Sequence, residues 1–282
     1  MATKIEIIRI ADVQGGAQIR TPYRVKGGGT PLVVGDRSNA WKASRGAATA
    51  LVDMAAEWYR RAKTPLVLVD AARDGSVQAH GRAKYEAWLA AGKPAENSSK
   101  FVPSAMKNVF VGKANESNHQ WGGAVDLGVA EMCEGDDAKL SLLWDVADDF
   151  GFMPIISRPS LQIDECWHFD RLGPLAKVRD MFRARAATRH SSYVLTATVG
   201  CLLAGTYVGD RQMERLAQAR LALAAALVEG GKSPGAPDGV LGRMTQESAA
   251  SVGLTVEPGV SASTILNQLD ERQLGHAELA AL

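Results

Sequence analysis

Cysteine is scarce in this chain of 282 residues: only Cys133, Cys166 and Cys201 occur, and no two of them form a CxxC pair. A disulfide framework needs an even and denser set of cysteines, and disulfides persist mainly in oxidising compartments. The cysteine content therefore argues against a disulfide-stapled fold. It predicts a chain that is made in a reducing cytoplasm.

An excess of one charge is also missing, because Lys and Arg number 32 and Asp and Glu number 31, which leaves a formal net charge of +1. Proteins that coat nucleic acid need a strong cationic field for the phosphates. The chain has a local basic run at Arg179, Arg183, Arg185 and Arg189. Such a run is usually a solvated face, although it would suit an anionic wall polymer. We therefore expect no nucleic-acid partner.

Long uncharged apolar runs are lacking as well. The N-terminal segment MATKIEIIRIADV is interrupted by Glu6 and Arg9, so it does not resemble the apolar part of a conventional signal peptide. Residues 191–209 carry no charge but are rich in Thr, Ser and Gly. This stretch predicts a buried helix followed by a turn, and no stable membrane insertion.

What remains is an ordinary globular composition, with 46% hydrophobic and 22% charged residues, in a chain long enough for one good-sized domain and a small one. Apolar periodicity and turn signals predict the main elements. The expected helices are 47–62, 81–91, 140–150, 213–228 and one from about residue 244. The expected strands lie near residue 5 and at 66–70, 123–129 and 161–169, with a turn at 27–31 and a polar loop around Pro94 and Pro103. From about residue 190 the chain becomes rich in Ala and Leu and predominantly helical, which predicts a domain boundary there.

Two segments concentrate the residues that carry chemistry: SNHQWGGAVD at 117–126 and ECWH at 165–168. Together they supply two imidazoles and two carboxylates. Zinc in hydrolases takes three nitrogen or oxygen ligands and keeps one position open. His119, Asp126 and His168 fit that requirement, which leaves Glu165 free to act as base and acid.

The spacing places conditions on the backbone. Gly122 and Gly123 allow a sharp bend between His119 and the strand that carries Asp126. Glu165 and His168 are three residues apart and would point to opposite faces of a flat strand. The strand must therefore twist, bulge or end between them if both side chains reach one metal.

The pattern SxHxxGxAxD followed by ExWH resembles the LAS (M15) metallopeptidases. This group includes D,D-carboxypeptidases and dipeptidases of the VanY and VanX type and the L-alanyl-D-glutamate endopeptidases of bacteriophage lysins. The resemblance covers roughly residues 40 to 180. The matching fixed positions are Ser117, His119, Gly122, Ala124, Asp126, Glu165, Trp167 and His168.

The resemblance implies an α+β fold of the Hedgehog or D,D-peptidase type, with a small antiparallel sheet and flanking helices around a zinc site, followed by a small helical bundle. It implies that His119, Asp126 and His168 bind Zn²⁺ and that Glu165 is the catalytic base.

In the family, an arginine at the end of an upstream strand holds the substrate carbonyl. The strand here reads LVLVDAARDGS, which makes Arg73 the candidate, with Ala72 in place of the aromatic residue that usually precedes it. Ser117 and Trp167 are expected to lie behind the ligands and to fix their orientation.

Residues 211–270 resemble the peptidoglycan-binding domain type 1, a small helical bundle. The resemblance rests on the helix MERLAQARLALAAAL and on a loop of the form DGxxGxxT, although the usual Gln of the first helix has no clear place. The wall-binding candidates are Asp238, Gly239, Gly242 and Thr245. The alternative is a generic helical bundle for oligomerisation or attachment to a larger assembly.

These resemblances predict zinc-dependent hydrolysis of peptide bonds in peptidoglycan stem peptides, by an endolysin or a virion-associated lysin. The predicted domains are a zinc peptidase at 1–185, a linker at 186–192 and a helical region at 193–282. The chain would reach the wall after lysis-type release or as part of a virion, since no conventional signal peptide is expected. The alternatives are a D-alanyl-D-alanine carboxypeptidase and a structural component of a tail or injection apparatus with a zinc-stabilised fold.

Competing interpretations of the same residues are weaker. A serine triad in the first segment would lack a nucleophile elbow and leave the second segment unused. Cys166 is better explained as a small buried apolar residue than as a thiol nucleophile. The acidic cluster at 134–137 lacks the ligand spacing of a calcium loop and predicts a solvated turn. Three histidines have no partner pattern and are expected at the surface: His80, His190 and His276.

Overall fold

The computed structural model describes residues 4–13, 19–20, 22–23, 32–33, 41–92, 113–163, 165–184 and 189–282, with the backbone alone for the three residue pairs and for 189–190. The turn expected at 27–31 and the polar loop around Pro94 and Pro103 lie outside these residues, as does the side chain of His190.

The fold is α+β and is built around a small sheet that is antiparallel apart from one edge, which agrees with the expected class. The sheet has the order β2 (Ile19–Arg20), β6 (Leu66–Asp70), β7 (Ala124–Leu127), β9 (His168–Asp170) and β8 (Met153–Pro154). Only β2 runs parallel to its neighbour β6. Two smaller sheets pair β1 (Ile7–Arg9) with β5 (Lys42–Ser44) and β3 (Pro22–Tyr23) with β4 (Leu32–Val33).

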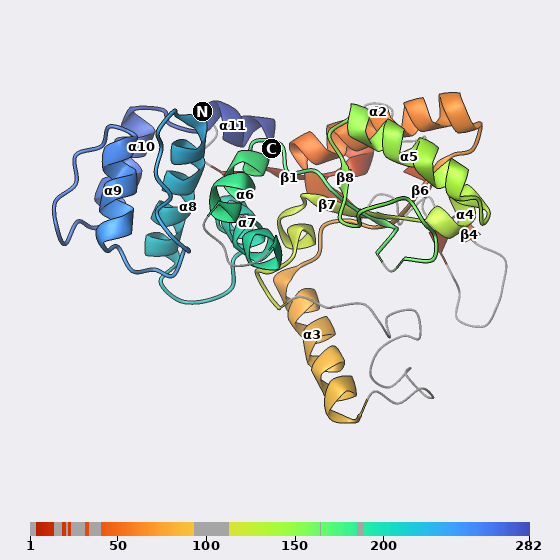
Figure 1. The fold of residues 1–282 in the computed structure, drawn as a ribbon, viewed down its shortest axis with the longest axis horizontal. Helices are drawn as coiled ribbons and strands as arrows, with labels where there is room; N and C mark the ends of the chain where they lie inside the picture. Colours follow the sequence, from red (N-terminus) through yellow and green to blue (C-terminus); the bar gives the residue numbers. More distant parts are fainter. Residues whose placement is uncertain are drawn as a thin grey trace.

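Helices flank this sheet, and from residue 175 onward every regular element that the structure describes is a helix (Figure 1). The first group comprises η1 (Ile10–Asp12), α2 (Arg45–Ala62), α3 (Gly75–Ala90), η5 (Asn118–Trp121), α4 (Val129–Cys133) and α5 (Asp137–Asp149). The second comprises α6 (Leu175–Arg183), α7 (Arg189–Ala204), α8 (Gln212–Leu227), α9 (Arg243–Ser251), α10 (Ala262–Glu271) and α11 (His276–Ala281). Figure 1 shows α2 and α5 at one end of the molecule and α8 to α10 at the other, with α6 and α7 between them.

Most predicted elements are confirmed, and two differ. The helix expected at 81–91 begins earlier, at Gly75, because the Asp74 side chain accepts a hydrogen bond from Ser76 N and caps it. The strand expected at 161–169 is wrong except for its end, since β9 begins only at His168. Glu165 has a φ of 67°, a left-handed conformation that an extended strand does not contain.

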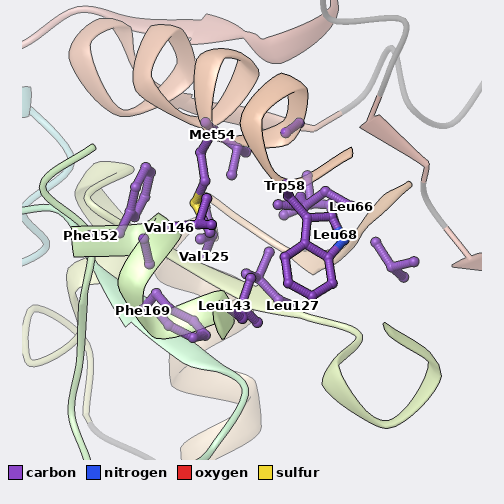
Figure 2. Packing of buried hydrophobic residues seen from close by; sticks show 14 of the residues in the cluster. Met54, Trp58, Leu66, Leu68, Val125, Leu127, Leu143, Val146, Phe152 and Phe169 are labelled. Carbon is purple, nitrogen blue, oxygen red and sulfur yellow. The ribbon is translucent and has the colours of Figure 1, made fainter. Parts of the chain in front are cut away.

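One face of the sheet is apolar and packs on α2 and α5. Figure 2 shows Met54 and Trp58 of α2 packed among side chains of β6, β7 and β9. Alternation along the strands sends Val125, Leu127 and Phe169 into this core. The same alternation sends the side chains between them to the opposite face, where they meet η5 and α7. Burying each large apolar side chain contributes about 1.5–3 kcal/mol, so this core fixes which residues face the other side.

A bulge in β6 adds the Asp70 carboxylate to the polar face of the sheet. Leu68 pairs with Leu127 and Asp70 pairs with Asp126, so two residues of β6 stand opposite one of β7. In a regular strand Asp70 would point into the core with Leu68. The extra residue, Val69, turns the Asp70 carboxylate toward the face that carries Asp126.

A second buried cluster joins the two halves of the chain. It contains Trp121 of η5, Leu175 of α6, Val199 of α7 and Leu223 of α8. The contact between η5 and α7 is close, because a Cβ on Gly200 would lie 2.5 Å from the Trp121 ring. A third cluster packs α8, α9 and α10 together.

The C-terminal part of the predicted linker at 186–192 is helical. α7 begins at Arg189, and residues 189–192 form its first turn. The expected buried helix followed by a turn is confirmed, since α7 ends at Ala204 and Gly205 has a φ of 71°. Among the described residues, no helix combines the length and apolar character needed to cross a bilayer.

Candidate metal centre

His119, Asp126 and His168 meet on the polar face of the sheet. His119 Nε2 lies 3.2 Å from Asp126 Oδ1 and 3.2 Å from His168 Nδ1, and His168 Nδ1 lies 3.1 Å from Asp126 Oδ1. All three residues are buried. Ligands of a tetrahedral zinc ion at 2.0–2.1 Å are spaced about 3.3–3.4 Å apart. The three atoms thus form a triangle of the size that one small cation requires, and a metal site at these residues is consistent with the geometry.

Strand register and one tight turn bring the three side chains together. Asp126 and His168 are direct partners on β7 and β9, so their side chains share a face. His119 comes from η5, which Gly122 ends with a φ of 79°. The bend predicted at Gly122 and Gly123 is confirmed, and a Cβ on Gly122 would lie 2.4 Å from Ser44 N.

Hydrogen bonds on the far side of each imidazole assign its proton. His119 Nδ1 lies 2.7 Å from the carbonyl oxygen of Ala71, which can only accept, so Nδ1 carries the hydrogen. His168 Nε2 lies 3.0 Å from the Asp170 carboxylate and carries the hydrogen by the same reasoning. When both rings are neutral, as metal binding requires, His119 Nε2 and His168 Nδ1 direct lone pairs at each other and at Asp126. Three lone pairs cannot hydrogen-bond to one another, and a cation between them satisfies all three.

The charges of the site are strongly coupled. Burial alone would raise the pKa of Asp126, but the charges and hydrogen bonds of His119 and His168 hold it well below its usual range. Burial alone would lower the pKa of His168, but the Asp170 charge and the hydrogen bonds to Asp126 and Asp170 raise it to about 10. Without a metal, His168 therefore takes up a second proton at Nδ1, beside Asp126, and a metal cation would replace this proton.

Glu165 lies beside the triangle without belonging to it. The three ligand atoms all lie within 4.8 Å of one another, and this group does not include the Glu165 carboxylate. Burial raises the pKa of Glu165, although the positive charges of His168, His119 and Arg73 oppose this. The predicted break in the strand is confirmed here, because Glu165 sits in the turn that precedes β9. A half-buried carboxyl with a raised pKa is suited to moving protons.

Arg73 follows β6 and lies against the same site. Its Nη2 donates to Asp126 Oδ2 at 3.1 Å, and its Nε donates to Asp70 Oδ2 at 2.5 Å. Its own backbone N–H donates to the His119 carbonyl at 3.0 Å. Arg73 therefore orients a ligand carboxylate through one oxygen while the other oxygen faces the imidazoles. The carbonyl-holding role inferred from the resemblance remains a prediction.

The other two expected site residues lie near the ligands in different ways. Ser117 is buried directly before η5, and its carbonyl accepts a hydrogen bond from Gln120 N. Trp167 is partly buried against the core, and its carbonyl accepts from Leu127 N. Both carbonyls thus hold backbone segments next to the candidate ligands. The expected effect of the two side chains on ligand orientation stays a prediction.

Sequence reasoning missed three residues around the ligands. Asp170 is buried and bonds His168, and Asp70 bonds Arg73. Tyr193 of α7 places its hydroxyl 3.5 Å from His168 Nε2. The alternation of β9 could have indicated Asp170, since it lies two residues after His168. Nothing in the sequence pattern pointed to Asp70 or Tyr193.

The four wall-binding candidates shape a loop of the C-terminal region. The Asp238 carboxylate accepts from Val240 N at 2.8 Å, and Gly239 has a φ of 82°. Gly242 precedes α9, and Thr245 is buried. Gln218 of α8 is also buried and bonds both Asp238 and Gly239, so it anchors this loop to the first long helix of the region. Contact with a wall polymer remains a prediction.

One surface assignment was wrong. His276 is only 8% exposed, and its Nε2 lies 3.0 Å from Asp270 Oδ1, which Arg220 also contacts at 2.8 Å. The reason is the short helix α11, which folds back onto the bundle and places this side chain between helices. His80 is exposed as expected.

Other minor predictions are confirmed. The three cysteines are free, and Cys166 is buried. The acidic cluster at 134–137 is an exposed turn in which Asp136 caps α5 and Glu134 pairs with Lys139.

In comparisons with known proteins, no family model, no curated protein and no solved structure matches this chain.

Proposed function

We propose that this protein is a zinc-dependent peptidase that cleaves peptide bonds in peptidoglycan stem peptides, with a Hedgehog or D,D-peptidase type of catalytic fold. The observation that carries the proposal is the convergence of three lone pairs, from His119, Asp126 and His168, beside a separate carboxyl with a raised pKa, Glu165. A purely structural zinc site is usually closed by four protein ligands and needs no spare base.

The protein's own groups have distinct roles in this proposal. A zinc ion held by the triad would supply Lewis-acid polarisation of the substrate carbonyl and a more acidic water. The Glu165 carboxylate accepts the proton of the attacking water and delivers it to the leaving amine nitrogen, which balances the hydrolysis. Arg73 keeps Asp126 oriented and places positive charge beside the carbonyl oxygen, where negative charge develops.

The substrate class follows from the resemblance of the two motifs to cell-wall peptidases and of residues 211–270 to wall-binding modules. We infer that the catalytic site receives the peptide while the C-terminal region is available to hold the polymer. Tethering of this kind raises the effective concentration of substrate at the site. Release by lysis or carriage on a virion would bring the protein to the wall.

Digestion of purified peptidoglycan by the full chain, loaded with zinc, tests the proposal. Mass spectrometry of the products identifies the new termini. New amino termini within the stem peptide support an endopeptidase, and release of terminal D-Ala supports the carboxypeptidase alternative. A zinc-loaded, folded protein that yields neither product contradicts the proposed function.

A further inference from the structure

Helix α7 contacts the candidate metal centre at His168, on the edge of the ring that faces away from the other two candidate ligands. Its Tyr193 places the hydroxyl oxygen 3.5 Å from His168 Nε2, the nitrogen that also lies 3.0 Å from Asp170 Oδ1. The proton on Nε2 thus has two oxygen acceptors on its far side. With both in place, the ring is held so that Nδ1, 3.1 Å from Asp126 Oδ1, points at the metal position.

The surroundings of Tyr193 keep its hydroxyl neutral. Burial raises the pKa of Tyr193 well above its usual value, and the charges of Asp170, Glu165 and Asp126 raise it further. A neutral phenol adds a dipole to this crowded group of carboxylates without adding another negative charge.

The same helix also holds the loop that carries the first ligand. Thr198 of α7 donates to the Asn115 carbonyl at 3.0 Å, and Gly200 packs against the Trp121 ring. Just after α7, the Val208 backbone exchanges two hydrogen bonds with the Asn115 side chain, at 2.8 and 2.9 Å. The Gln120 side chain, next to His119, donates to the Thr206 carbonyl at 2.6 Å. Residues 198–208 therefore hold the loop on both sides of His119.

We propose that Tyr193 is a positioning residue of the metal centre and that α7, with the segment after it, is built into that centre. The proposal rests on the metal site of the proposed function and is independent of which bond the protein cleaves. In this proposal the helical region helps to position a metal ligand, in addition to any contact that it makes with a wall polymer.

Metal affinity measured without any substrate tests the proposal. Metal-free full-length protein is titrated with zinc in competition with a chromogenic chelator, for wild type, Tyr193→Phe and the control Tyr59→Phe. Tyr59 lies on α2 and is 54% exposed. We expect Tyr193→Phe to bind zinc about 10-fold more weakly, at the lower end of the loss of about 10–100-fold seen when an outer partner of a ligand is removed. Tyr59→Phe should match wild type.

A double-mutant cycle separates positioning from general destabilisation. Asp170→Asn and Tyr193→Phe change two acceptors of the same N–H, so the loss in the double variant should exceed the product of the two single losses. The absorption spectrum of the cobalt-loaded protein should shift in Tyr193→Phe, because it reports the geometry around the metal.

Each outcome decides the proposal. Zinc affinity and a cobalt spectrum unchanged in Tyr193→Phe would overturn it and leave the proposed function standing. Independent losses in the cycle would also overturn it, because Tyr193 would then act elsewhere than on His168. A folded wild-type protein that binds no divalent metal would overturn this inference together with the proposed function.

Discussion

At the scale of single residues, the site holds more negative charge than its protein groups can balance. Asp126, Glu165 and Asp170 lie around the imidazoles, and Asp70 lies beside Arg73. Among the described residues, Arg73 is the cation of this group, and it bonds Asp70 and Asp126. With every carboxyl ionised, the formal sum of these five side chains is −3. A divalent cation reduces it to −1, so metal binding relieves repulsion that folding alone leaves in place.

The first prediction concerns Glu165. Glu165→Gln keeps the size of the side chain but removes the proton-accepting carboxylate. Since Glu165 lies outside the ligand group, this variant should retain its zinc and lose at least about 10²-fold in kcat. Metal content and turnover are measured side by side, with His119→Ala as the variant that should lose the metal. Loss of zinc from Glu165→Gln would make Glu165 a ligand instead.

The second prediction concerns Arg73. Arg73→Ala leaves Asp126 Oδ2 without its donor, so zinc affinity should fall by about 10–100-fold as well as turnover. Arg73→Lys keeps the charge but cannot bridge Asp70 and Asp126 with a planar fork, so it should restore affinity only in part. Chelator competition measures both. Full zinc affinity in Arg73→Ala would confine this side chain to substrate contact.

Residue types in a linear pattern were sufficient to predict that His119, Asp126 and His168 come together, because each stands in a spaced motif. Asp70 could not be predicted, since regular alternation places it in the core and only the bulge at Val69 turns it outward. Tyr193 could not be predicted either, because it lies 25 residues after His168 and beyond the predicted domain boundary near residue 190. Contacts that depend on packing leave no local signal.

At the scale of elements, the turn between η5 and β7 links one ligand to the next. Gly122 has a φ of 79° and lies against the backbone of β5. The chain can turn at Gly122 because glycine has no side chain that would clash with the backbone of β5. β5 thereby fixes the position of His119 relative to the sheet.

The third prediction follows from that packing. Gly122→Ala should destabilise the fold by more than about 1 kcal/mol, since it adds backbone strain and a clash with Ser44 N. Gly151→Ala is a matched control: Gly151 has a φ of 74° and its added Cβ meets nothing within 4 Å. Urea unfolding compares the two. Equal losses would show that strain alone matters at Gly122.

The long helix α2 was predictable because apolar periodicity over four or more turns is a strong signal. The position of α8 was also predicted, but this helix buries every residue from 217 to 225, so it is not amphipathic there. The short strand β9 was not delimited correctly, because only three residues pair and the preceding turn has the same apolar character. All three residues of β9 are buried, but their side chains alternate between the apolar core, for Phe169, and the opposite face, for His168 and Asp170.

At the scale of the whole molecule, one buried cluster crosses the predicted boundary at 186–192. Ile5, Trp121, Leu175 and Leu223 lie in it together. The two predicted domains therefore share buried side chains. The shared cluster leads us to expect that heat unfolds them in a single transition.

The fourth prediction concerns acid. Burial would raise the pKa of Asp270, but hydrogen bonds from His276 and Arg220 lower it below its ordinary value of 3.8. A lowered pKa means that the stabilisation is complete above about pH 4 and is lost as the pH falls through the lower, folded value. Asp270→Asn should therefore be less stable than wild type at pH 7, and the difference should shrink toward pH 3. Urea unfolding across this range, with the exposed Asp53→Asn as control, checks it; a constant difference would contradict it.

The pairing of Asn115 with Val208 has a consequence for synthesis. The two residues are 93 positions apart, and Val208 follows His168 by 40 residues. At about 5–20 residues per second, a ribosome needs about 2–8 s to add that stretch. During this interval a nascent chain already contains His119, Asp126 and His168. It still lacks Val208, whose hydrogen bonds to Asn115 hold the loop that carries His119. Tight metal capture should therefore come late, once the growing chain has passed Val208.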